Sequence, residues 1–424
     1  MKVFKFGGAS VKDAESIRNI IELLSLYQGE KLAIVISAMG KNTNAFEELV
    51  SSCLSSNEHF FTLINQRKTF HLEIINELIS DKSNPIFDEV HFIFDDLKNT
   101  FSNSLQENEK ALYSEIVSVG ELLSTKIINA FLLQEGFISQ WVDARKIIRT
   151  EDKFLSANVE WEITQELFKT KFLPSIDTCD ILITQGFVGH NASNQTTTLG
   201  REGSDFSAAI VAHCCNAEDV TIWKDVPGML NADPKWFDNT VKLDKISFRE
   251  AIELSYYGAS VIHPKTIKPL QNKNIPLYVK SFLNPTEDGT VIHSCTKNDH
   301  LIPSYIFKKD QILFSITPKD FSFIGEENLS DIFRILSSLD MKINVMQNSA
   351  LSFSILIDDK NLDIAQFLKL FSETYQVKYN SELELITIRH YNQETIARLT
   401  SSKSIILQQL TRETARIIVA KGAE

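Results

Sequence analysis

The sequence lacks several features that mark particular classes of protein. Its five cysteines are odd in number and none is spaced Cys-x-x-Cys, which argues against a disulfide framework and indicates a reduced chain. Its nine histidines form no His-Glu-x-x-His pattern, so no zinc site and no metal-ligating residues are predicted. We find no apolar signal core at the N-terminus and no apolar run near the ~20 residues of a membrane span. We therefore expect a cytoplasmic protein without membrane contact.

Positive charge is also scarce. The chain has 43 Lys and Arg against 55 Asp and Glu, a formal charge of −12. Nucleic-acid binding draws most of its affinity from clustered basic residues, so no nucleic-acid partner is expected. An anionic substrate would have to be held by a few local cations. The ordinary content of hydrophobic (43%) and charged (23%) residues over 424 residues predicts two or three globular domains.

Short apolar runs alternate with helical patterns through the first two thirds of the chain. The predicted strands are residues 3–6, 32–37, 181–185, 220–223 and 277–280, and residues 44–135 have the spacing of covering helices. This alternation predicts an α/β fold with an open, mostly parallel sheet sandwiched by helices. Ligands collect at the carboxyl ends of parallel strands, so the loops that follow the strands are the places to look for a site.

The polar stretch at residues 295–300 interrupts this alternation and predicts a domain boundary. Beyond it, strands at 312–317, 342–346, 353–357, near 376 and at 383–389, with helices at 329–339 and 364–372, give the order βαββαβ. That order indicates an α+β, ferredoxin-like module. A tail with strands at 405–410 and 415–419 and a brief helix at 393–399 is similar to a partial second copy.

The first turn of the chain carries a lysine ahead of two adjacent glycines, Lys5-Phe6-Gly7-Gly8-Ala9-Ser10. Glycines without a Cβ let the backbone approach an anion closely, and the lysine adds a positive charge. In the Walker A loop the lysine follows the glycines instead. The turn indicates a phosphate site, although a Gly-Gly pair after a strand is more often an ordinary turn.

A second segment, residues 196–205, places hydroxyls, glycines, Arg201 and Asp205 ahead of an apolar helix predicted at 206–214. A guanidinium between flexible glycines is suited to bidentate capture of a carboxylate or phosphate. Asp205, at the same mouth, is suited to receive an ammonium group. The simpler interpretation is that Ser204 or Asp205 caps the helix, but a cap would not require Arg201.

Together these two segments resemble the amino-acid kinase family, and within it the aspartate kinases. The resemblance extends, in family order, to SAMGKNTN at 37–44, SVGELLS at 118–124, WKDVPGMLNADPK at 223–235, GASVIHP at 258–264 and VKSFLNP at 279–285. It implies a kinase domain over residues 1–296, an ACT module over 304–380 and a shortened second ACT module over 381–424. The implied reaction is ATP-dependent phosphorylation of the L-aspartate β-carboxylate to 4-phospho-L-aspartate, the first step of lysine, threonine and methionine biosynthesis.

The resemblance also implies residue roles. Lys5 would balance charge on the transferring phosphoryl group and the glycines would supply backbone donors, because positioning and electrostatics dominate such transfer. The implied catalytic residues are Lys5, Gly7, Gly8 and Asp205. The implied substrate contacts are Ser37, Thr43, Glu121, Arg201 and Ser204. The implied nucleotide contacts are Lys5, Gly8, Ser10, Lys224, Asp225, Leu230, Lys235 and Ser260, with Mg²⁺ held mainly by the ATP phosphates.

The sequence departs from the family pattern at several of these positions. Ala9 stands where the family usually has Thr, Lys224 where Thr is common, and Leu230 where Tyr often packs on the nucleotide. Ser260 replaces a frequent lysine beside the phosphates. In the regulatory part, Asn344 and Ser349 fall in a segment that resembles the ACT effector site, which implies lysine or threonine as an effector. ACT modules generally pair between chains, which implies a homodimer or larger assembly.

Two alternatives remain open at this stage. The same fold serves other substrates, including glutamate, acetylglutamate and nucleoside monophosphates, although the Thr-Thr-Leu-Gly-Arg context and the ACT tail count against them. The second alternative is an inactive amino-acid sensor, and the departures at Ala9, Leu230 and Ser260 favour it. Retention of Lys5 and Asp205 counts more strongly for an enzyme. The 424 residues leave no room for a fused homoserine dehydrogenase, so none is expected.

Overall fold

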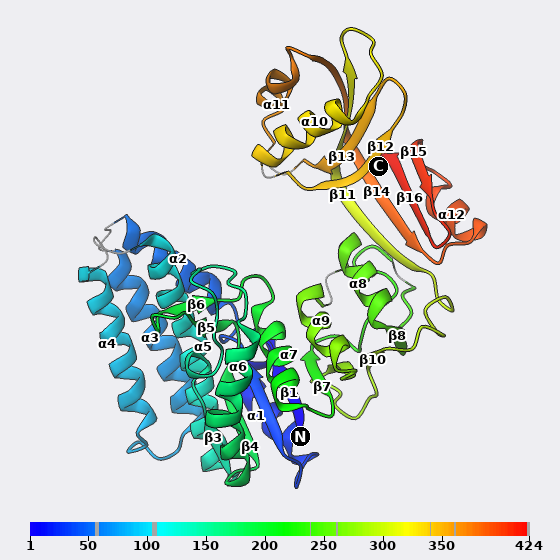
Figure 1. The fold of residues 1–424 in the computed structure, drawn as a ribbon. Helices are drawn as coiled ribbons and strands as arrows, with labels where there is room; N and C mark the ends of the chain where they lie inside the picture. The colour runs from blue at the N-terminus through cyan, green and yellow to red at the C-terminus, as the bar shows by residue number, and fades with distance from the viewer. Residues whose placement is uncertain are drawn as a thin grey trace. The chain divides into compact units, whose positions relative to one another are not determined.

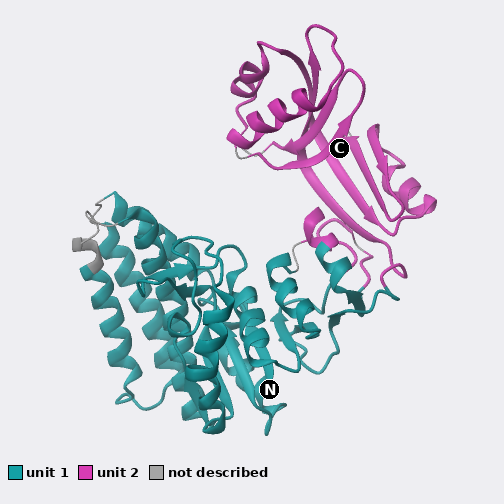
Figure 2. Ribbon diagram, in the orientation of Figure 1, with its two compact units in different colours: residues 1–229, 242–252, 260–298 teal, residues 230–241, 253–259, 299–424 magenta. Residues whose placement is uncertain are grey.

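A computed structural model describes residues 1–55, 59–103, 108–237, 239–259, 262–339, 341–359 and 362–421. They form two compact units (Figure 2). The first unit contains residues 1–229, 242–252 and 260–298, and the second contains residues 230–241, 253–259 and 299–424. Residues 230–241 and 253–259 therefore belong to the second unit, although in the sequence they lie between segments of the first.

The first unit is built on an eight-stranded sheet with the order β3-β4-β2-β1-β7-β9-β10-β8. Its strands are β1 (Lys2–Phe6), β2 (Leu32–Ile36), β3 (Ser139–Trp141), β4 (Ile181–Gln185), β7 (Val220–Lys224), β8 (Lys245–Ser247), β9 (Leu277–Ser281) and β10 (Thr290–His293). Neighbouring strands pair in parallel, except that β9 and β10 are antiparallel. All five predicted strands of this unit are confirmed.

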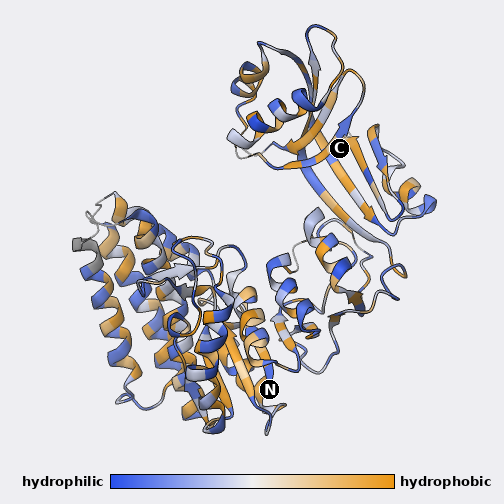
Figure 3. Ribbon diagram, in the orientation of Figure 1, coloured by the Kyte–Doolittle hydropathy of each residue, from blue (hydrophilic) through white to orange (hydrophobic). Residues whose placement is uncertain are grey.

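Helices cover this sheet, as the apolar spacing predicts (Figure 1). They are α1 (Ala14–Ser25), α2 (Asn42–Leu54), α3 (His59–Leu78), α4 (Ile86–Asn103), α5 (Glu109–Gln134), α6 (Trp161–Leu167), α7 (Gly203–Cys215), α8 (Phe248–Tyr257) and α9 (Pro264–Asn272). Phe4 and Phe6 of β1 join one apolar cluster with α1 to α5. Successive strand residues point to opposite faces, so Lys5 faces the other side, where α7 packs against β1. The central strands of this sheet are largely hydrophobic, as the hydropathy colouring of Figure 3 shows.

Helix α5 corrects one expectation from the sequence. It is long and apolar enough to cross a membrane, and it alone meets that test among the described residues, although we expected no such run. Yet 72% of its most apolar stretch is buried inside the fold. Both of its long sides face protein, because it packs against α2 and α4 and also against β3, β4 and the short strand β6 (Thr196–Thr198). Its composition is therefore that of the core helix of a large α/β unit, which is buried nearly all round.

The second unit contains a six-stranded antiparallel sheet with the order β12-β13-β11-β14-β16-β15. Its elements are β11 (Ser304–Pro318), α10 (Glu326–Ser338), β12 (Ile343–Asn348), β13 (Phe353–Asp358), α11 (Ile364–Phe371), β14 (Tyr375–Arg389), α12 (Gln393–Thr400), β15 (Ile405–Leu410) and β16 (Thr414–Ala420). The predicted βαββαβ order is confirmed, and α10 and α11 pack on β11, β13 and β14 through a cluster of aromatic and aliphatic residues. The strands expected near 376 and at 383–389 form one strand, β14.

The two long strands β11 and β14 are central in this sheet and join β12 and β13 on one side to β16 and β15 on the other. The first five residues of β11, 304–308, pair with the end of β14, whereas the rest of β11 pairs with its beginning and with β13. The pairing register shifts between the two stretches, and Asp310 and Glu382 adopt left-handed backbone conformations there, with φ of 53° and 56°. The tail strands β16 and β15 thus complete a sheet whose other strands are β14 and the start of β11.

Candidate functional site

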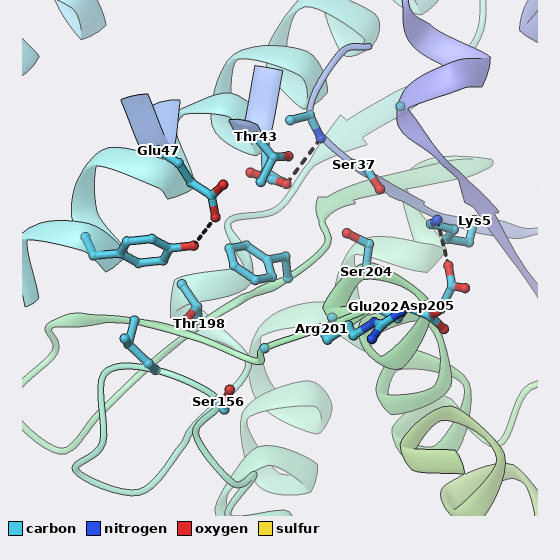
Figure 4. Close-up of a pocket in the computed structure, with 18 of the residues that line it drawn as sticks. Lys5, Ser37, Thr43, Glu47, Ser156, Thr198, Arg201, Glu202, Ser204 and Asp205 are labelled. Atoms are coloured by element: carbon cyan, nitrogen blue, oxygen red, sulfur yellow. Dashed lines mark hydrogen bonds and ion pairs between the residues drawn. The ribbon is translucent and has the colours of Figure 1, made fainter. Parts of the chain in front are cut away.

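One cavity of about 630 Å³ in the first unit gathers most of the predicted site residues (Figure 4). It lies at the carboxyl ends of β1, β2 and β7, where α2, α5 and α7 supply the walls. The predicted residues that line it are Lys5, Gly8, Ser37, Thr43, Glu121, Arg201, Ser204, Asp205 and Lys224. Segments almost 220 residues apart in the sequence therefore meet at one site, as the parallel topology requires.

Two cations and one carboxylate meet at one end of the cavity. Lys5 Nζ lies 2.6 Å from Asp205 Oδ1, and Lys224 Nζ lies 3.7 Å from Asp205 Oδ2. Burial raises the pKa of the Asp205 carboxyl, but attraction to Lys5 and Lys224 outweighs burial and lowers this pKa below its ordinary value. Asp205 is therefore ionised, and the three groups together carry one positive charge in excess.

The helix-cap interpretation of Asp205 and Ser204 is wrong. Helix α7 begins at Gly203, after Glu202 in a left-handed conformation, and no side chain caps it. Asp205 instead lies in the first turn of the helix, where its carboxylate is stabilised by the helix dipole and by the two lysines. Asp205 pairs with the chain's own Lys5 and Lys224 ammonium groups, and the expected pairing with a substrate ammonium stays a prediction.

Glu121 provides a second, differently placed carboxylate. It projects from α5, only 2% of its surface is exposed, and its Oε1 accepts a hydrogen bond of 3.3 Å from the Ala38 backbone N–H. Its Oε2 is buried and has no hydrogen-bond partner among the described residues. Burial raises the pKa of Glu121 to about 8, although the Ala38 N–H and the charge of Lys5 oppose the increase. A buried acceptor without a partner fits a ligand that brings a donor.

Arg201 lies at the mouth of the cavity and is exposed. Among the described residues it has no hydrogen bond or ion pair, so its guanidinium is available to an anionic ligand. The preceding Gly200 has φ of 80°, and a Cβ there would lie 2.5 Å from Ser156 Oγ. Glycine is therefore required at this position by both backbone conformation and space, which fixes the path of the chain into Arg201.

The glycine turn after β1 is shaped by the loop after β2. A Cβ on Gly8 would lie 2.4 Å from the carbonyl oxygen of Gly40, and the Gly40 N–H donates to Gly8 O at 2.9 Å. A Cβ on Gly7 would lie 3.3 Å from Lys5 Nζ. The two glycines thus leave space for a neighbouring backbone and for the lysine ammonium, which is a stricter requirement than an ordinary turn.

Several predicted residues lie outside the cavity lining. Gly7, Ser10 and Asp225 belong to the first unit, where Ser10 is buried and Asp225 is exposed. Leu230 and Lys235 belong to the second unit, and Ser260 lies outside the described residues. The catalytic role implied for Gly7 and the nucleotide contacts implied for the other five residues therefore stay predictions. Within the described part of the chain, no group of three His, Cys, Asp or Glu side chains is arranged to hold a metal ion.

Sequence reasoning missed part of the cavity wall. The lining residues that lie in no quoted motif are Glu47, Tyr113, Leu155, Ser156 and Phe187. Ala38, Gly40, Thr198, Gly200, Glu202 and Gly203 lie in the quoted motifs but were given no site role. Tyr113 donates a hydrogen bond of 2.6 Å to Glu47 Oε1 and lies eight residues before Glu121. Eight residues are close to two helical turns, so the 3.6-residue period of α5 would have placed Tyr113 on the same wall as Glu121.

In the second unit, the predicted effector residue Asn344 is buried and its amide is bonded inside the protein. Its Oδ1 accepts from Lys308 Nζ at 2.9 Å, and its Nδ2 donates to Gln311 and Asp358 at 2.8 Å each. Ser349 is exposed and bonds to Ser352 across a turn. Asn344 therefore stabilises the sheet where β11 changes partners, and an effector role for it stays a prediction.

Comparisons with known proteins show which family the chain resembles. The model of the amino acid kinase family matches residues 1–281. Lysine-sensitive aspartokinase 3 of Escherichia coli is 31% identical over 357 residues, which are 84% of this chain and 78% of that protein. A bifunctional aspartokinase/homoserine dehydrogenase of Buchnera aphidicola is 30% identical, and the match covers 90% of this chain but 47% of that relative. The crystal structure of E. coli aspartokinase III with aspartate and ADP superposes with a TM-score of 0.81 at 26% identity, covering 99% of this chain and 96% of that one.

Proposed function

The chain belongs to the amino acid kinase family and, within it, to the aspartokinases, and from this premise we propose how its cavity performs the reaction. The protein is an ATP-dependent kinase that phosphorylates the carboxyl group of L-aspartate. The observation that supports a complete active site here is the joint placement of Lys5, Asp205, Glu121 and Arg201 around one cavity. An inactive sensor would have no need to keep all four.

Aspartate is proposed to bind between Arg201 and Glu121. The exposed guanidinium of Arg201 would hold the α-carboxylate, and the unpartnered Oε2 of Glu121 would accept from the α-ammonium. Ser37 and Thr43, which line the same wall, would hydrogen-bond the substrate. The β-carboxylate would then point toward Lys5, where the phosphoryl group arrives.

ATP is proposed to place its terminal phosphates at the Lys5 and Gly8 end of the cavity. The excess positive charge there matches the phosphates, and the close backbone at Gly8 lets N–H groups approach them. Asp205 at this end is already paired with two lysines, so Mg²⁺ would enter bound to the ATP phosphates rather than in a protein cage. Ser10, Asp225, Leu230, Lys235 and Ser260 remain proposed nucleotide contacts.

Regulation and assembly are proposed for the second unit. The E. coli enzyme has also been solved with lysine and aspartate, at 26% identity to this chain, which supports lysine as an effector here, with threonine as the alternative. The outer strands β12 and β15 expose Met346, Ile405 and Ile406. Exposed apolar strand edges favour pairing between copies, so we propose a homodimer or larger homo-oligomer. A cytoplasmic location is proposed from the five free cysteines.

The binding mode predicts a selective defect for Arg201→Ala. Loss of the charged contact to the α-carboxylate should raise the KM for aspartate by about 30-fold to 1000-fold, the equivalent of roughly 2–4 kcal/mol, while the KM for ATP changes less than threefold. Steady-state kinetics with each substrate varied in turn measures both values. Arg201→Lys keeps the charge but not the bidentate geometry, so its KM for aspartate should lie between those of wild type and Arg201→Ala. Equal effects on both substrates would show that Arg201 does not bind aspartate.

A further inference from the structure

Lys224 is the residue in the cavity whose role the proposed function leaves least defined. It stands at the end of β7, and β7 pairs in parallel with β1 so that Ile222 lies opposite Lys5. Residues opposite one another share a face of the sheet, and residues two apart on a strand share a face as well. Lys5 and Lys224 therefore project on the same side, toward the first turn of α7.

Asp205 joins the two ammonium groups. Each oxygen of its carboxylate takes a different lysine, Oδ1 at 2.6 Å from Lys5 and Oδ2 at 3.7 Å from Lys224. The Asp205 side chain is only 5% exposed, whereas that of Lys224 is 24% exposed. The carboxylate is thus buried, and Lys224 is the more accessible of its two lysine partners.

Charge counting indicates what Lys224 adds. With Lys5 alone, the pair with Asp205 would be neutral and would offer no net attraction to a phosphate. With Lys224, the three groups carry a net charge of +1 in a partly buried site, where electrostatic attraction is stronger than in water. A fixed excess of positive charge is what stabilises the charge that spreads over the oxygens of a phosphoryl group during transfer.

We propose that Lys224 is a second catalytic cation, which acts beside Lys5 on the transferring phosphoryl group, and that Asp205 is the positioning residue that holds both lysines. This assignment rests on the proposed function and goes beyond a nucleotide contact for Lys224. It concerns two positions at which the sequence departs from the pattern of the family it resembles, Lys224 and Ser260.

The step is balanced without a proton donor or base. A β-carboxylate oxygen of aspartate, already anionic, forms a bond to the γ-phosphorus, while the bond from that phosphorus to the β,γ-bridging oxygen breaks. The bridging oxygen keeps the electron pair and leaves as the terminal oxygen of ADP. The positive charges of Lys5 and Lys224 stabilise the equatorial phosphoryl oxygens and the oxygen of the leaving ADP.

The test compares Lys224→Met with wild-type enzyme, measuring kcat, the KM for aspartate and the Kd for ADP by calorimetry. We expect kcat to fall about 100-fold, with the KM for aspartate and the Kd for ADP within threefold of wild type, because ADP lacks the transferred group. Lys280→Met is the matched control: Lys280 lies opposite Trp223 on the adjacent β9, its ammonium 5.5 Å from the Trp223 ring centroid, and it does not line the cavity. The kcat of Lys280→Met should stay within twofold of the wild-type value.

Restoring the charge separates a catalytic from a structural role. Aminoethylation of Lys224→Cys rebuilds a side chain of lysine length with its ammonium, and should recover kcat at least tenfold. The same reagent should leave Lys224→Met unchanged, which controls for the five native cysteines. This comparison also applies if Lys224→Met folds poorly.

Three results would overturn the proposal: kcat of Lys224→Met near that of wild type, an ADP affinity that falls as much as kcat, or no recovery on aminoethylation. Wild-type enzyme without aspartate-dependent turnover would instead contradict the proposed function itself. An active wild type with an unimpaired Lys224→Met variant contradicts only the inference about Lys224.

Discussion

Replacing Lys5 by methionine is expected to lower kcat by about 1000-fold while the KM for aspartate changes little. The Lys5 ammonium is 2.6 Å from Asp205 and at the end of the cavity where the β-carboxylate and the γ-phosphate are proposed to meet. An interaction made mainly in the transition state affects kcat rather than substrate binding, and one such preorganised group typically contributes 10²–10³-fold. Single-turnover measurements of ADP formation would isolate this step from product release.

The same substitution should also destabilise the protein. It leaves the buried Asp205 carboxylate with Lys224 as its remaining ion-pair partner, at 3.7 Å. Removing one member of a buried ion pair costs on the order of 3 kcal/mol. The double variant Lys5→Met/Asp205→Asn removes the stranded charge, so it should regain most of the stability in chemical denaturation but none of the activity. Activity that returns together with stability would show that Lys5 is a structural residue.

Glu121→Gln is expected to impair the binding of aspartate strongly. It replaces the buried carboxylate, whose free Oε2 is proposed to accept from the substrate ammonium, by a neutral amide of the same shape. Loss of a buried charged hydrogen bond should raise the KM for aspartate by about 100-fold. In wild type, the pKa of Glu121 is raised to about 8, so an ammonium must displace the proton and the affinity for aspartate should increase as the pH rises toward 8. The variant should lose this pH dependence.

Stability provides an independent check on Glu121. Its pKa in the folded state, about 8, lies above the ordinary 4.5, so the unfolded chain releases the proton at a lower pH than the folded protein does. The Glu121 contribution to stability is therefore largest below pH 4.5 and is lost progressively as the pH rises to 8. Relative to Glu121→Gln, substrate-free wild type should lose roughly 2–3 kcal/mol of unfolding free energy between pH 6 and pH 8. A difference that does not vary with pH would mean that Glu121 is already ionised in the folded protein.

The sequence was sufficient to predict a site residue or a strand where the residue types and the local pattern point to the same feature. Lys5 is near the end of β1, just before the glycine turn, and Arg201 lies in a glycine-containing turn after β6 (Thr196–Thr198). In both places a cation stands next to glycines, and this local pattern indicated an anion site. Five of the eight strands of the first sheet, β1, β2, β4, β7 and β9, were predictable because a buried parallel strand is a continuous apolar run. Strands β3, β5 (Val188–His190), β6 (Thr196–Thr198), β8 and β10 were missed because three or four residues carry too little pattern.

What the sequence could not supply is which groups meet. Asp205 was assigned to a helix cap or a substrate ammonium, because its distance from Lys5 and Lys224 depends on the packing of α7 against β1 and β7. Ser156 enters the cavity through a loop that bears no motif and is held by contact with Gly200. Such proximities arise from tertiary packing between segments distant in the chain, which no local pattern encodes.

The central claim is that this cavity transfers phosphoryl groups from ATP to aspartate, and ADP release in the presence of Mg·ATP tests it most directly. Purified enzyme would be assayed with L-aspartate, L-glutamate and N-acetyl-L-glutamate as separate acceptors, with Lys5→Ala as the control for contaminating kinases. We predict turnover with L-aspartate, at least 100-fold lower kcat/KM with the other two, and almost none in the control. Turnover that does not depend on aspartate, or that survives Lys5→Ala, would contradict the account.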